Sequence, residues 1–496
     1  MGKENHILAI DQSTSGTKVL LVNEKGQIIH KCSESHKQYY LQTGWVEHDP
    51  IEIYENVKKL IKELVQTSGI SQEELAVLAI TNQRETVVVW DKETGVPVYN
   101  AIVWQCRRTS ALCKELKDQG YEEMIQSKTG LKADPYFSAS KIKWILDHVD
   151  GVKVRATEGK LLLGTIDSWL IWKLTCGKVH ATDYSNASRT LLFNIDTLQW
   201  DDDLLALFDI PRSMLPSIKD SNDIFGVTED LNLPFTNLPI SGVIGDSQGA
   251  LFGQKCFEPG MAKATYGTGT SVMMHTGELV KGSNGLVTSI AWGLNGKVEY
   301  ALEGIINSTG DVIKWLKEQL EIIKGIDEAE KLASSISDNQ GVYLVPAFVG
   351  LGAPYWNPYT RAAILGMSRD TGKAHIVRAA LESIAYQVKD VIELMQCESN
   401  IQIKTIRVDG GATSNRLLMQ YQADMLDINV TASKVAELSS MGSVYLAGLG
   451  IGIWRSIEEI NKLNQEHKEY QPLMTKDERD KYYQGWKQSV RGVLVS

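Results

Sequence analysis

A short stretch near the N-terminus most constrains how this chain can fold: an apolar run ends on an acid and the chain then turns back. Residues 7–10 are Ile-Leu-Ala-Ile, and Asp11 follows them. Small hydroxyl residues and a glycine come next, and a second aliphatic run at residues 19–22 begins directly after Lys18. The pattern predicts two strands of a hairpin joined by a polar loop, and not the strand-to-helix turn of a Walker-type phosphate loop.

The loop of this hairpin carries groups that suit phosphate and a divalent cation. A glycine-containing tip presents backbone N–H groups, and the hydroxyls of Thr14 and Ser15 and the ammonium of Lys18 lie alongside them. Asp11 supplies a carboxylate, which is the kind of ligand that hydrated Mg²⁺ takes. Taken alone, the stretch fits an ordinary hairpin with a polar turn equally well.

Strands that end in polar elbows recur along the chain. Residues 75–80 predict a strand that runs through a polar elbow into a strand at residues 87–90, which repeats the organisation of the first hairpin. Residues 239–245 predict a strand that ends at Asp246, with a helix after it, and loops rich in glycine and hydroxyls follow at residues 262–271 and 406–415. Helices are predicted at residues 51–67 and 161–172. We therefore expect two similar domains, residues 1–252 and 253–496, that face a shared cleft.

Composition excludes several classes of function. A net charge of −10 argues against a nucleic-acid or anionic-membrane surface, because both select basic patches. The six cysteines are scattered and show no metal-ligand spacing, which is typical of reduced cytoplasmic proteins. No apolar run reaches the length of a membrane span. The composition thus predicts a soluble cytoplasmic protein that is not inserted in a membrane.

Charged and aromatic residues of the N-terminal half indicate a polyhydroxy substrate. Arg84 and Glu85 are adjacent at the end of a predicted strand, where both can hydrogen-bond hydroxyl groups. Trp104 and Tyr136 lie beside polar residues in loops, as aromatics do that cover the C–H faces of polyols. Asp246 is placed like a general base that takes a hydroxyl proton. The competing interpretation of each is a core aromatic or a surface ion pair.

The two glycine-rich loops of the C-terminal half add a nucleotide to this picture. The stretch Thr268-Gly269-Thr270 can hold phosphate oxygens. Glycines 410 and 411 let a flat group such as adenine or its ribose approach the backbone closely. A nucleotide held across the expected cleft is the first hypothesis for function.

Seven ordered stretches resemble one known family over nearly the whole chain. They are GWVEHDP at 44–50, ITNQRET at 80–86, YNAIVWQCRR at 99–108, YFS with KIKW at 136–144, DYSNASRT at 183–190, GLGAPYW at 350–356 and VDGGA at 408–412. These stretches resemble the FGGY carbohydrate kinases, and most closely the glycerol kinase branch of that family. The resemblance implies an α/β fold of two actin-like, ribonuclease-H-like domains around an interdomain cleft, and phosphorylation of a terminal polyol hydroxyl by ATP with Mg²⁺.

The resemblance also implies roles for individual residues. Asp246 would be the base, and Asp11 would position Mg²⁺. The acceptor site would be lined by Arg84, Glu85, Trp104, Tyr136, Asp246, Ser247 and Ser271. ATP would be held by Thr14, Ser15, Lys18, Thr268, Gly310, Gly411 and Asn415. Members of the family are commonly homodimers or homotetramers, and the same is expected here.

Departures from the pattern leave the acceptor open. Ser247 stands where glycerol kinases usually have glutamine, and Ser271 stands where they usually have a phenylalanine that covers the glycerol carbons. Both serines enlarge the acceptor pocket and make it more polar. Glycerol, with sn-glycerol 3-phosphate as product, is the first prediction; a larger polyol or a ketose is the alternative. A nucleotide-binding actin-like sensor without kinase activity is the alternative from another class.

Overall fold

The computed structural model describes residues 4–357, 359–435 and 437–494, and the chain divides into two compact units. Unit 1 comprises residues 1–255, 288–300 and 437–464, and unit 2 comprises residues 256–287, 301–436 and 465–496. The domain boundary expected near residue 252 stays a prediction. No helix in the described part of the chain combines the length and the apolar character that crossing a bilayer requires.

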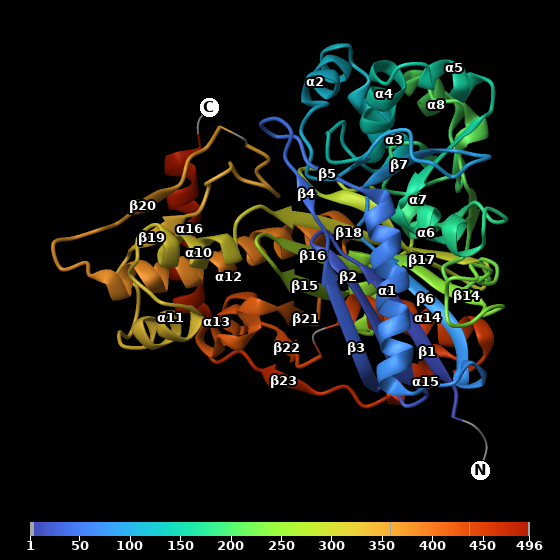
Figure 1. The fold of residues 1–496 in the computed structure, drawn as a ribbon. Helices are drawn as coiled ribbons and strands as arrows, with labels where there is room; N and C mark the ends of the chain where they lie inside the picture. The colour runs from blue at the N-terminus through green and yellow to red at the C-terminus, as the bar shows by residue number, and fades with distance from the viewer. Residues whose placement is uncertain (1–3, 358, 436, 495–496) are drawn as a thin grey trace. The chain divides into compact units, whose positions relative to one another are not determined.

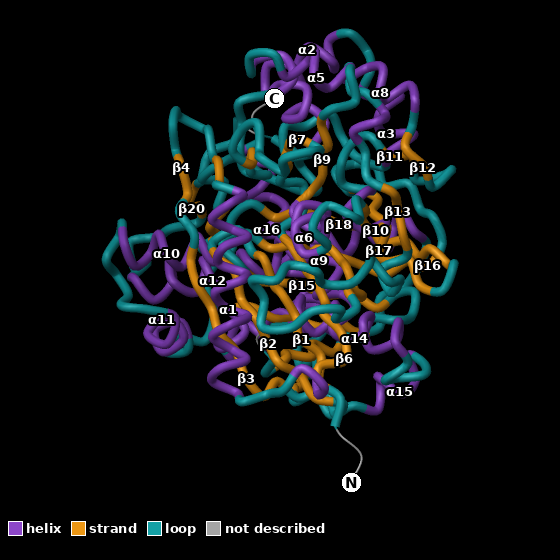
Figure 2. The backbone as a smooth tube through the Cα atoms, turned by 45° about the vertical axis from the view of Figure 1, so that its right-hand side comes forward, coloured by secondary structure: helices purple, strands orange, loops and turns teal. Residues whose placement is uncertain are grey.

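A five-stranded sheet forms the centre of unit 1, in the order β14-β6-β1-β2-β3 (Figures 1 and 2). The first hairpin is confirmed, because β1 (His6–Gln12) pairs antiparallel with β2 (Gly16–Asn23), and β3 (Ile28–Ser35) continues the antiparallel order. On the other side, β6 (Leu75–Asn82) runs parallel to β1, and β14 (Ile240–Gly245) runs parallel to β6. The polar residues that follow β6 and β14 therefore emerge at the same edge of the sheet.

Helix α1 (Pro50–Ser68), which confirms the helix predicted from apolar spacing, covers strands β2 and β3 (Figure 1). Asp49 caps its first turn by accepting the N–H of Ile51, and Pro50 occupies the first helical position, where its missing N–H costs nothing. Gly69 ends the helix with a φ of 70°, a left-handed conformation that glycine adopts without strain. The buried residues Ile53, Val57, Leu60, Ile61 and Leu64 recur on one face.

Helices α9 (Asp246–Gly253) and α14 (Leu438–Ile451) pack together against β6 and β14. Glycines make this approach close: a Cβ on Gly442 would lie 2.0 Å from the carbonyl oxygen of Gly249, and one on Gly253 would lie 2.0 Å from that of Leu438. Side chains at these positions would push the helices apart. The start of α9, which carries Asp246, is fixed by this contact.

A second sheet of unit 1 corrects two sequence predictions. It has the order β4-β5-β8-β7-β9, and its longest pair is β7 (Val87–Asp91) with β9 (Leu161–Thr165). The elbow after β6 therefore does not close a hairpin, because β6 and β7 belong to different sheets. The helix predicted at residues 161–172 is also wrong in its first part: residues 161–165 are β9, and α6 (Ile166–Leu174) follows. The short strands are β4 (Gln38–Tyr39), β5 (Glu47–His48) and β8 (Ala101–Ile102).

Unit 2 repeats the strand order of unit 1. Its main sheet contains β18 (Lys297–Ile306), β16 (Thr270–Gly277), β15 (Met261–Tyr266), β21 (Thr405–Gly410), β22 (Asn429–Ser433) and β23 (His467–Tyr470) in that order. As in unit 1, an antiparallel hairpin (β15 and β16) is followed by two parallel strands (β21 and β22). The predicted fold class, two α/β halves of one design, is confirmed. The largely buried helix α12 (Lys373–Ser399) contributes many residues to the hydrophobic core of unit 2.

Shorter elements complete the two units. Those of unit 1 include α2 (Ser110–Asp118), α3 (Glu122–Thr129), α4 (Ser138–His148), α5 (Val152–Thr157), α7 (Tyr184–Ala187), α8 (Asp202–Phe208) and α15 (Ile457–Lys462). Those of unit 2 include α10 (Gly310–Glu318), α11 (Ile326–Ala333), β19 (Tyr343–Val345), β20 (Ala363–Leu365), α13 (Arg416–Leu426) and α16 (Lys476–Val493). The helices α4 and α7 flank the site residues of unit 1.

Candidate active site

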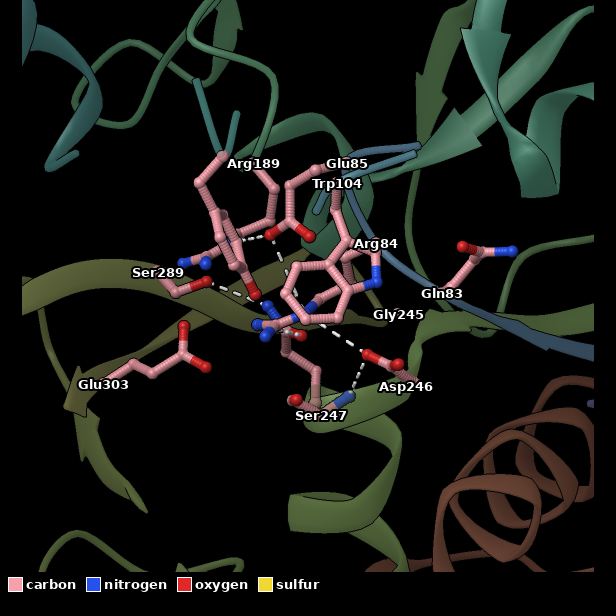
Figure 3. Close-up of polar contacts among 12 residues, drawn as sticks. Gln83, Arg84, Glu85, Trp104, Arg189, Gly245, Asp246, Ser247, Ser289 and Glu303 are labelled. Atoms are coloured by element: carbon pink, nitrogen blue, oxygen red, sulfur yellow. Dashed lines mark hydrogen bonds and ion pairs between the residues drawn. The ribbon is translucent and has the colours of Figure 1, made fainter. Parts of the chain in front are cut away.

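Charged residues gather where β6 and β14 end in unit 1. The Nε atom of Arg84 lies 3.2 Å from an oxygen of Asp246 and 3.9 Å from an oxygen of Glu85. Figure 3 shows Arg84 lying between these two carboxylates. The side chains of Arg84 and Glu85 are 4% and 1% exposed, whereas that of Asp246 is 37% exposed. Asp246 is thus the most solvent-exposed of these three side chains.

Glu85 has a second cationic neighbour that the sequence prediction missed. The Nε atom of the fully buried Arg189 donates to Glu85 at 2.6 Å (Figure 3). Glu85 itself has a φ of 60°, an uncommon conformation for a residue with a side chain. A buried carboxylate needs a positively charged partner, so an acid predicted at the end of a buried strand indicates that a cation lies nearby. That cation is Arg189, in the family-like stretch at residues 183–190.

Arg84 is held from its other side by Gln248. One guanidinium nitrogen of Arg84 donates to Gln248 Oε1 at 3.2 Å, and the Gln248 amide nitrogen donates to Ser289 Oγ at 2.8 Å. Gln248 is fully buried, so its amide has a fixed orientation. Neither Gln248 nor Ser289 was predicted. The position before Gln248 is Ser247, whose N–H donates to Asp246 at 2.7 Å.

The two predicted aromatics lie together beside these charges. The ring centroids of Trp104 and Tyr136 are 5.2 Å apart, and both side chains are half-buried. The guanidinium of Arg189 lies 5.9 Å from the Tyr136 ring centroid. The indole N–H of Trp104 donates to Thr14 Oγ1 at 2.9 Å, which links the aromatic pair to the hairpin loop at the N-terminus.

The hairpin loop brings Asp11 and Lys18 together, as the strand register requires. These residues are paired across β1 and β2, and the Lys18 ammonium lies 3.8 Å from a carboxylate oxygen of Asp11. Asp11 is 5% exposed and accepts a hydrogen bond from Ser440 at 2.9 Å. Burial raises the pKa of Asp11, and Lys18 and Ser440 oppose that rise.

Glu437 is a further acid at this loop that the sequence prediction missed. It accepts from Lys18 at 2.7 Å and from Lys31 at 2.9 Å. Burial would raise the pKa of Glu437, but the hydrogen bonds from the two lysines lower it. No local signal could have found this residue, because 419 positions separate it from Lys18. The described residues contain no cluster of three or more His, Cys, Asp or Glu side chains suited to a metal ion.

The predicted nucleotide residues of unit 2 lie on two loops. Thr268 is in the β15–β16 turn, and its carbonyl accepts the N–H groups of Thr309 and Asp311 at the start of α10. Gly310 lies against the same turn, where a Cβ would meet the carbonyl oxygen of Gly267 at 2.4 Å. Glycine is therefore required at residue 310 for the turn and the helix to meet.

The second loop of unit 2 contains Gly411 and Asn415. The space beside Gly411 is open, since a Cβ there would meet no atom within 4 Å. Asn415 caps helix α13 by accepting the N–H of Leu418 at 2.9 Å, while its own amide nitrogen is buried without a hydrogen-bond partner. The loop thus offers an approachable backbone and one unused donor.

Ser271 lies in a polar network of unit 2. Its hydroxyl donates to Glu303 at 2.9 Å and accepts from the buried Lys263 at 3.3 Å. Lys263 also donates to Thr265 at 3.1 Å, and Thr265 donates to Asp409 at 2.8 Å. The Ser271 hydroxyl is therefore held between a carboxylate and an ammonium group.

Comparison with known proteins assigns this geometry to a family. The N-terminal domain of the FGGY family of carbohydrate kinases matches residues 6–253, and the C-terminal domain of that family matches residues 262–451. The chain belongs to the FGGY family of carbohydrate kinases. Glycerol kinase 2 of Thermotoga maritima is 52% identical over 98% of this chain and 98% of its own length. Glycerol kinase of Alkaliphilus metalliredigens is 50% identical over 99% of this chain and 98% of its own length.

A solved structure of an FGGY kinase has the same fold throughout. Glycerol kinase of Plasmodium falciparum, crystallised with ADP, superimposes on this chain with a TM-score of 0.95 at 38% sequence identity. The match covers 100% of this chain and 99% of that one. The relation therefore extends over both units of this FGGY kinase.

Proposed function

We propose that this protein transfers the γ-phosphoryl group of ATP to a terminal hydroxyl of glycerol, giving sn-glycerol 3-phosphate and ADP. The observation that carries the proposal is the group of Arg84, Glu85 and Asp246 at the ends of the parallel strands β6 and β14. Full-length relatives named glycerol kinase support glycerol over a larger polyol or a ketose, and support an enzyme over a nucleotide sensor.

In the proposed reaction each group of the acceptor site has its own role. Glu85 accepts hydrogen bonds from the hydroxyl groups of glycerol, and Arg84 donates hydrogen bonds to them. Trp104 and Tyr136 pack against the glycerol carbons. Asp246 takes the proton of the reacting hydroxyl group of glycerol. The oxygen of that hydroxyl forms a bond to the γ-phosphorus, and the bond from the γ-phosphorus to the ADP oxygen breaks. The ion pair with Arg84 fixes the orientation of the Asp246 carboxylate before the substrate arrives.

The phosphate and metal residues complete the proposal. Thr14, Ser15 and Lys18 of unit 1, and Thr268, Gly310, Gly411 and Asn415 of unit 2, would hold ATP. Asp11 would hold Mg²⁺: a single carboxylate fits this ion, which usually binds one or two protein carboxylates, several waters and the substrate phosphates. When bound, Mg²⁺ neutralises charge on the phosphate oxygens.

The test is ADP release with a panel of acceptors. Glycerol, four- and five-carbon polyols and ketoses would each be assayed at equal concentration with ATP and Mg²⁺. We expect kcat/KM to be highest for glycerol. A higher kcat/KM for a longer polyol or a ketose would contradict the choice of acceptor, and the absence of turnover with every acceptor would contradict the kinase assignment.

Two further properties belong to the same proposal. The family resemblance supports a homodimer or homotetramer, and the composition supports a location in the cytoplasm. Sedimentation velocity of the purified protein measures the oligomeric state, and a single monomeric species at micromolar concentration would contradict a dimer or tetramer. Cell fractionation of the source organism tests the location, and recovery outside the cytoplasmic fraction would contradict it.

A further inference from the structure

A fully buried lysine holds the loop that carries Tyr136. Lys141 lies on α4 and its side chain is 0% exposed. Its ammonium donates to the carbonyl oxygen of Pro135, to that of Tyr136 at 2.9 Å and to that of Phe137 at 3.0 Å. An ammonium has three donors, so the three consecutive carbonyls use all of them.

The N–H groups of the same loop are held by Asp134. The N–H of Tyr136 donates to the Asp134 carboxylate at 2.8 Å, and that of Phe137 donates to the Asp134 carbonyl at 3.2 Å. Every backbone N–H and C=O group from Pro135 to Phe137 therefore has a partner, proline having no N–H. A loop with a fully satisfied backbone has one favoured conformation.

The loop continues into further contacts with the acceptor residues. Ser138, the next residue, donates to the carbonyl oxygen of Glu85 at 3.0 Å. The N–H of Ala139 donates to the carbonyl oxygen of Thr190, the neighbour of Arg189. The conformation of the loop thus sets where the Tyr136 ring lies relative to the buried pair of Glu85 and Arg189.

A buried ammonium is a costly way to hold a loop. Burial lowers the pKa of Lys141 to about 8, and Glu85, Cys106, Cys113 and Asp134 oppose that shift. An apolar side chain of similar length would avoid this cost, but the three carbonyls would lose the hydrogen bonds that Lys141 donates to them. The buried charge of Lys141 is therefore explained by the three backbone carbonyls that it binds.

We infer that Lys141 is a positioning residue for the acceptor site: together with Asp134 it fixes the Pro135–Phe137 backbone and so places Tyr136 against the substrate. The inference rests on the proposed function, because Tyr136 is taken to contact the acceptor. It adds a residue that does not itself touch substrate, and it explains why a cation is buried beside the site.

The first test is a set of single variants assayed with glycerol and ATP. Lys141→Met removes the three donors and keeps the length of the side chain. We expect kcat/KM for glycerol to fall about 100-fold, as displaced groups at active sites commonly do, while KM for ATP changes less than about twofold. Lys143→Met is the matched control, because Lys143 is on the same helix but pairs with Asp147. The control should retain wild-type kinetics.

The decisive test is a double-mutant cycle with Tyr136→Ala. If Lys141 acts through Tyr136, Lys141→Met should cost less than about threefold in kcat/KM when Tyr136 is already absent. Equal losses in both backgrounds would overturn the inference and leave Lys141 a residue of the general fold. Equal rises in KM for glycerol and for ATP would overturn it as well.

A second variant keeps the test informative if Lys141→Met does not fold. Asp134→Ala removes the carboxylate that accepts the Tyr136 N–H and pairs with Arg107, and because that side chain is 24% exposed we expect this variant to fold. We expect the same selective loss for glycerol and the same dependence on Tyr136, and independent effects would overturn the inference. Wild-type protein without glycerol turnover would instead contradict the proposed function, so the two failures are distinguishable.

Discussion

Asp246 differs from its charged neighbours in one respect, which is its exposure. Arg84, Glu85 and Arg189 have side chains that are 4%, 1% and 0% exposed, and Asp246 is 37% exposed. The buried groups pair with one another and hold their positions, whereas the carboxylate of Asp246 also reaches solvent. A general base must hold a fixed position and must also be accessible to the substrate, and the Asp246 carboxylate meets both conditions.

Asp246→Asn should therefore remove phosphoryl transfer while sparing nucleotide binding. Asparagine keeps the shape of the side chain but does not take up the hydroxyl proton, so we expect kcat for glycerol to fall by about 10³. ATP affinity, measured by calorimetry, should stay within about twofold. Asp202→Asn, on an exposed part of α8, is the control. Retained turnover in Asp246→Asn would refute its role as base.

Lys141 gives a prediction on stability against pH. Its pKa in the folded protein is about 8, lowered by burial, while a free lysine titrates near about 10.4. Between these values the unfolded chain binds more protons, so the free energy of unfolding rises with pH. Relative to Lys141→Met, the wild-type value should rise by about 2 kcal/mol from about pH 8 to about pH 10. Parallel urea-unfolding profiles for the two proteins would contradict this.

At the scale of elements, the contact between α9 and α14 sets the position of the catalytic strand ends. Both helices use glycine where they touch, and the atoms that face these glycines are backbone atoms, which have little room to move. Asp246 is the first residue of α9. A shift of α9 would therefore move the base relative to Arg84.

Gly442→Ala should separate the two helices. The new Cβ would lie 2.0 Å from the carbonyl oxygen of Gly249, and overpacking of this kind costs about 1–3 kcal/mol. We expect a lower melting temperature and a lower kcat. Gly492→Ala is the control, since a Cβ at that position of α16 meets no atom within 4 Å. Alanine there should leave stability equal or raise it by up to about 1 kcal/mol. Equal behaviour of the two variants would contradict the packing argument.

Helices with a clear capping residue, a glycine stop and helical spacing of apolar residues could be predicted from the sequence. The type of a short apolar segment, strand or helix, could not. Helix α1 has a cap at Asp49, a glycine stop at Gly69 and apolar residues at helical spacing. By contrast, residues 161–172 contain two short apolar runs, at 161–163 and 169–172, and neither run is long enough for periodicity to separate the strand β9 from the helix α6. The error at β6 and β7 has another cause, because sheet membership depends on partners distant in the sequence.

At the scale of the whole molecule, the candidate site divides between residues on motifs and residues far from them. Arg84, Glu85 and Asp246 stand out in the sequence by their positions after predicted strands, and Asp246 directly follows an apolar strand, where an acid is costly unless it is solvated or used. Glu437 and Ser440, which complete the surroundings of Lys18 and Asp11, are more than 400 positions away. No local pattern encodes such a contact, and only the folded chain reveals it.

Hydrogen exchange can map both substrates over the whole chain. Glycerol should slow amide exchange at residues 82–86, 134–137 and 246–248, which surround the proposed acceptor residues. ADP should slow exchange at residues 266–270 and 409–415, which contain the proposed nucleotide loops. Protection by glycerol that spares residues 82–86, or by ADP that spares residues 409–415, would contradict the assignment of the respective site.

The late position of α14 in the chain has a consequence for biosynthesis. Strands β1, β6 and β14 and helix α9 lie within the first 255 residues, but the helix that packs against all of them is residues 438–451. On the ribosome, unit 1 therefore stays incomplete until residue 451 has emerged, and the surface that α14 covers is exposed until then. A gene fragment that ends at residue 255 would encode a unit without its last helix. We expect such a fragment to be less prone to aggregate when residues 437–464 are supplied in cis or in trans.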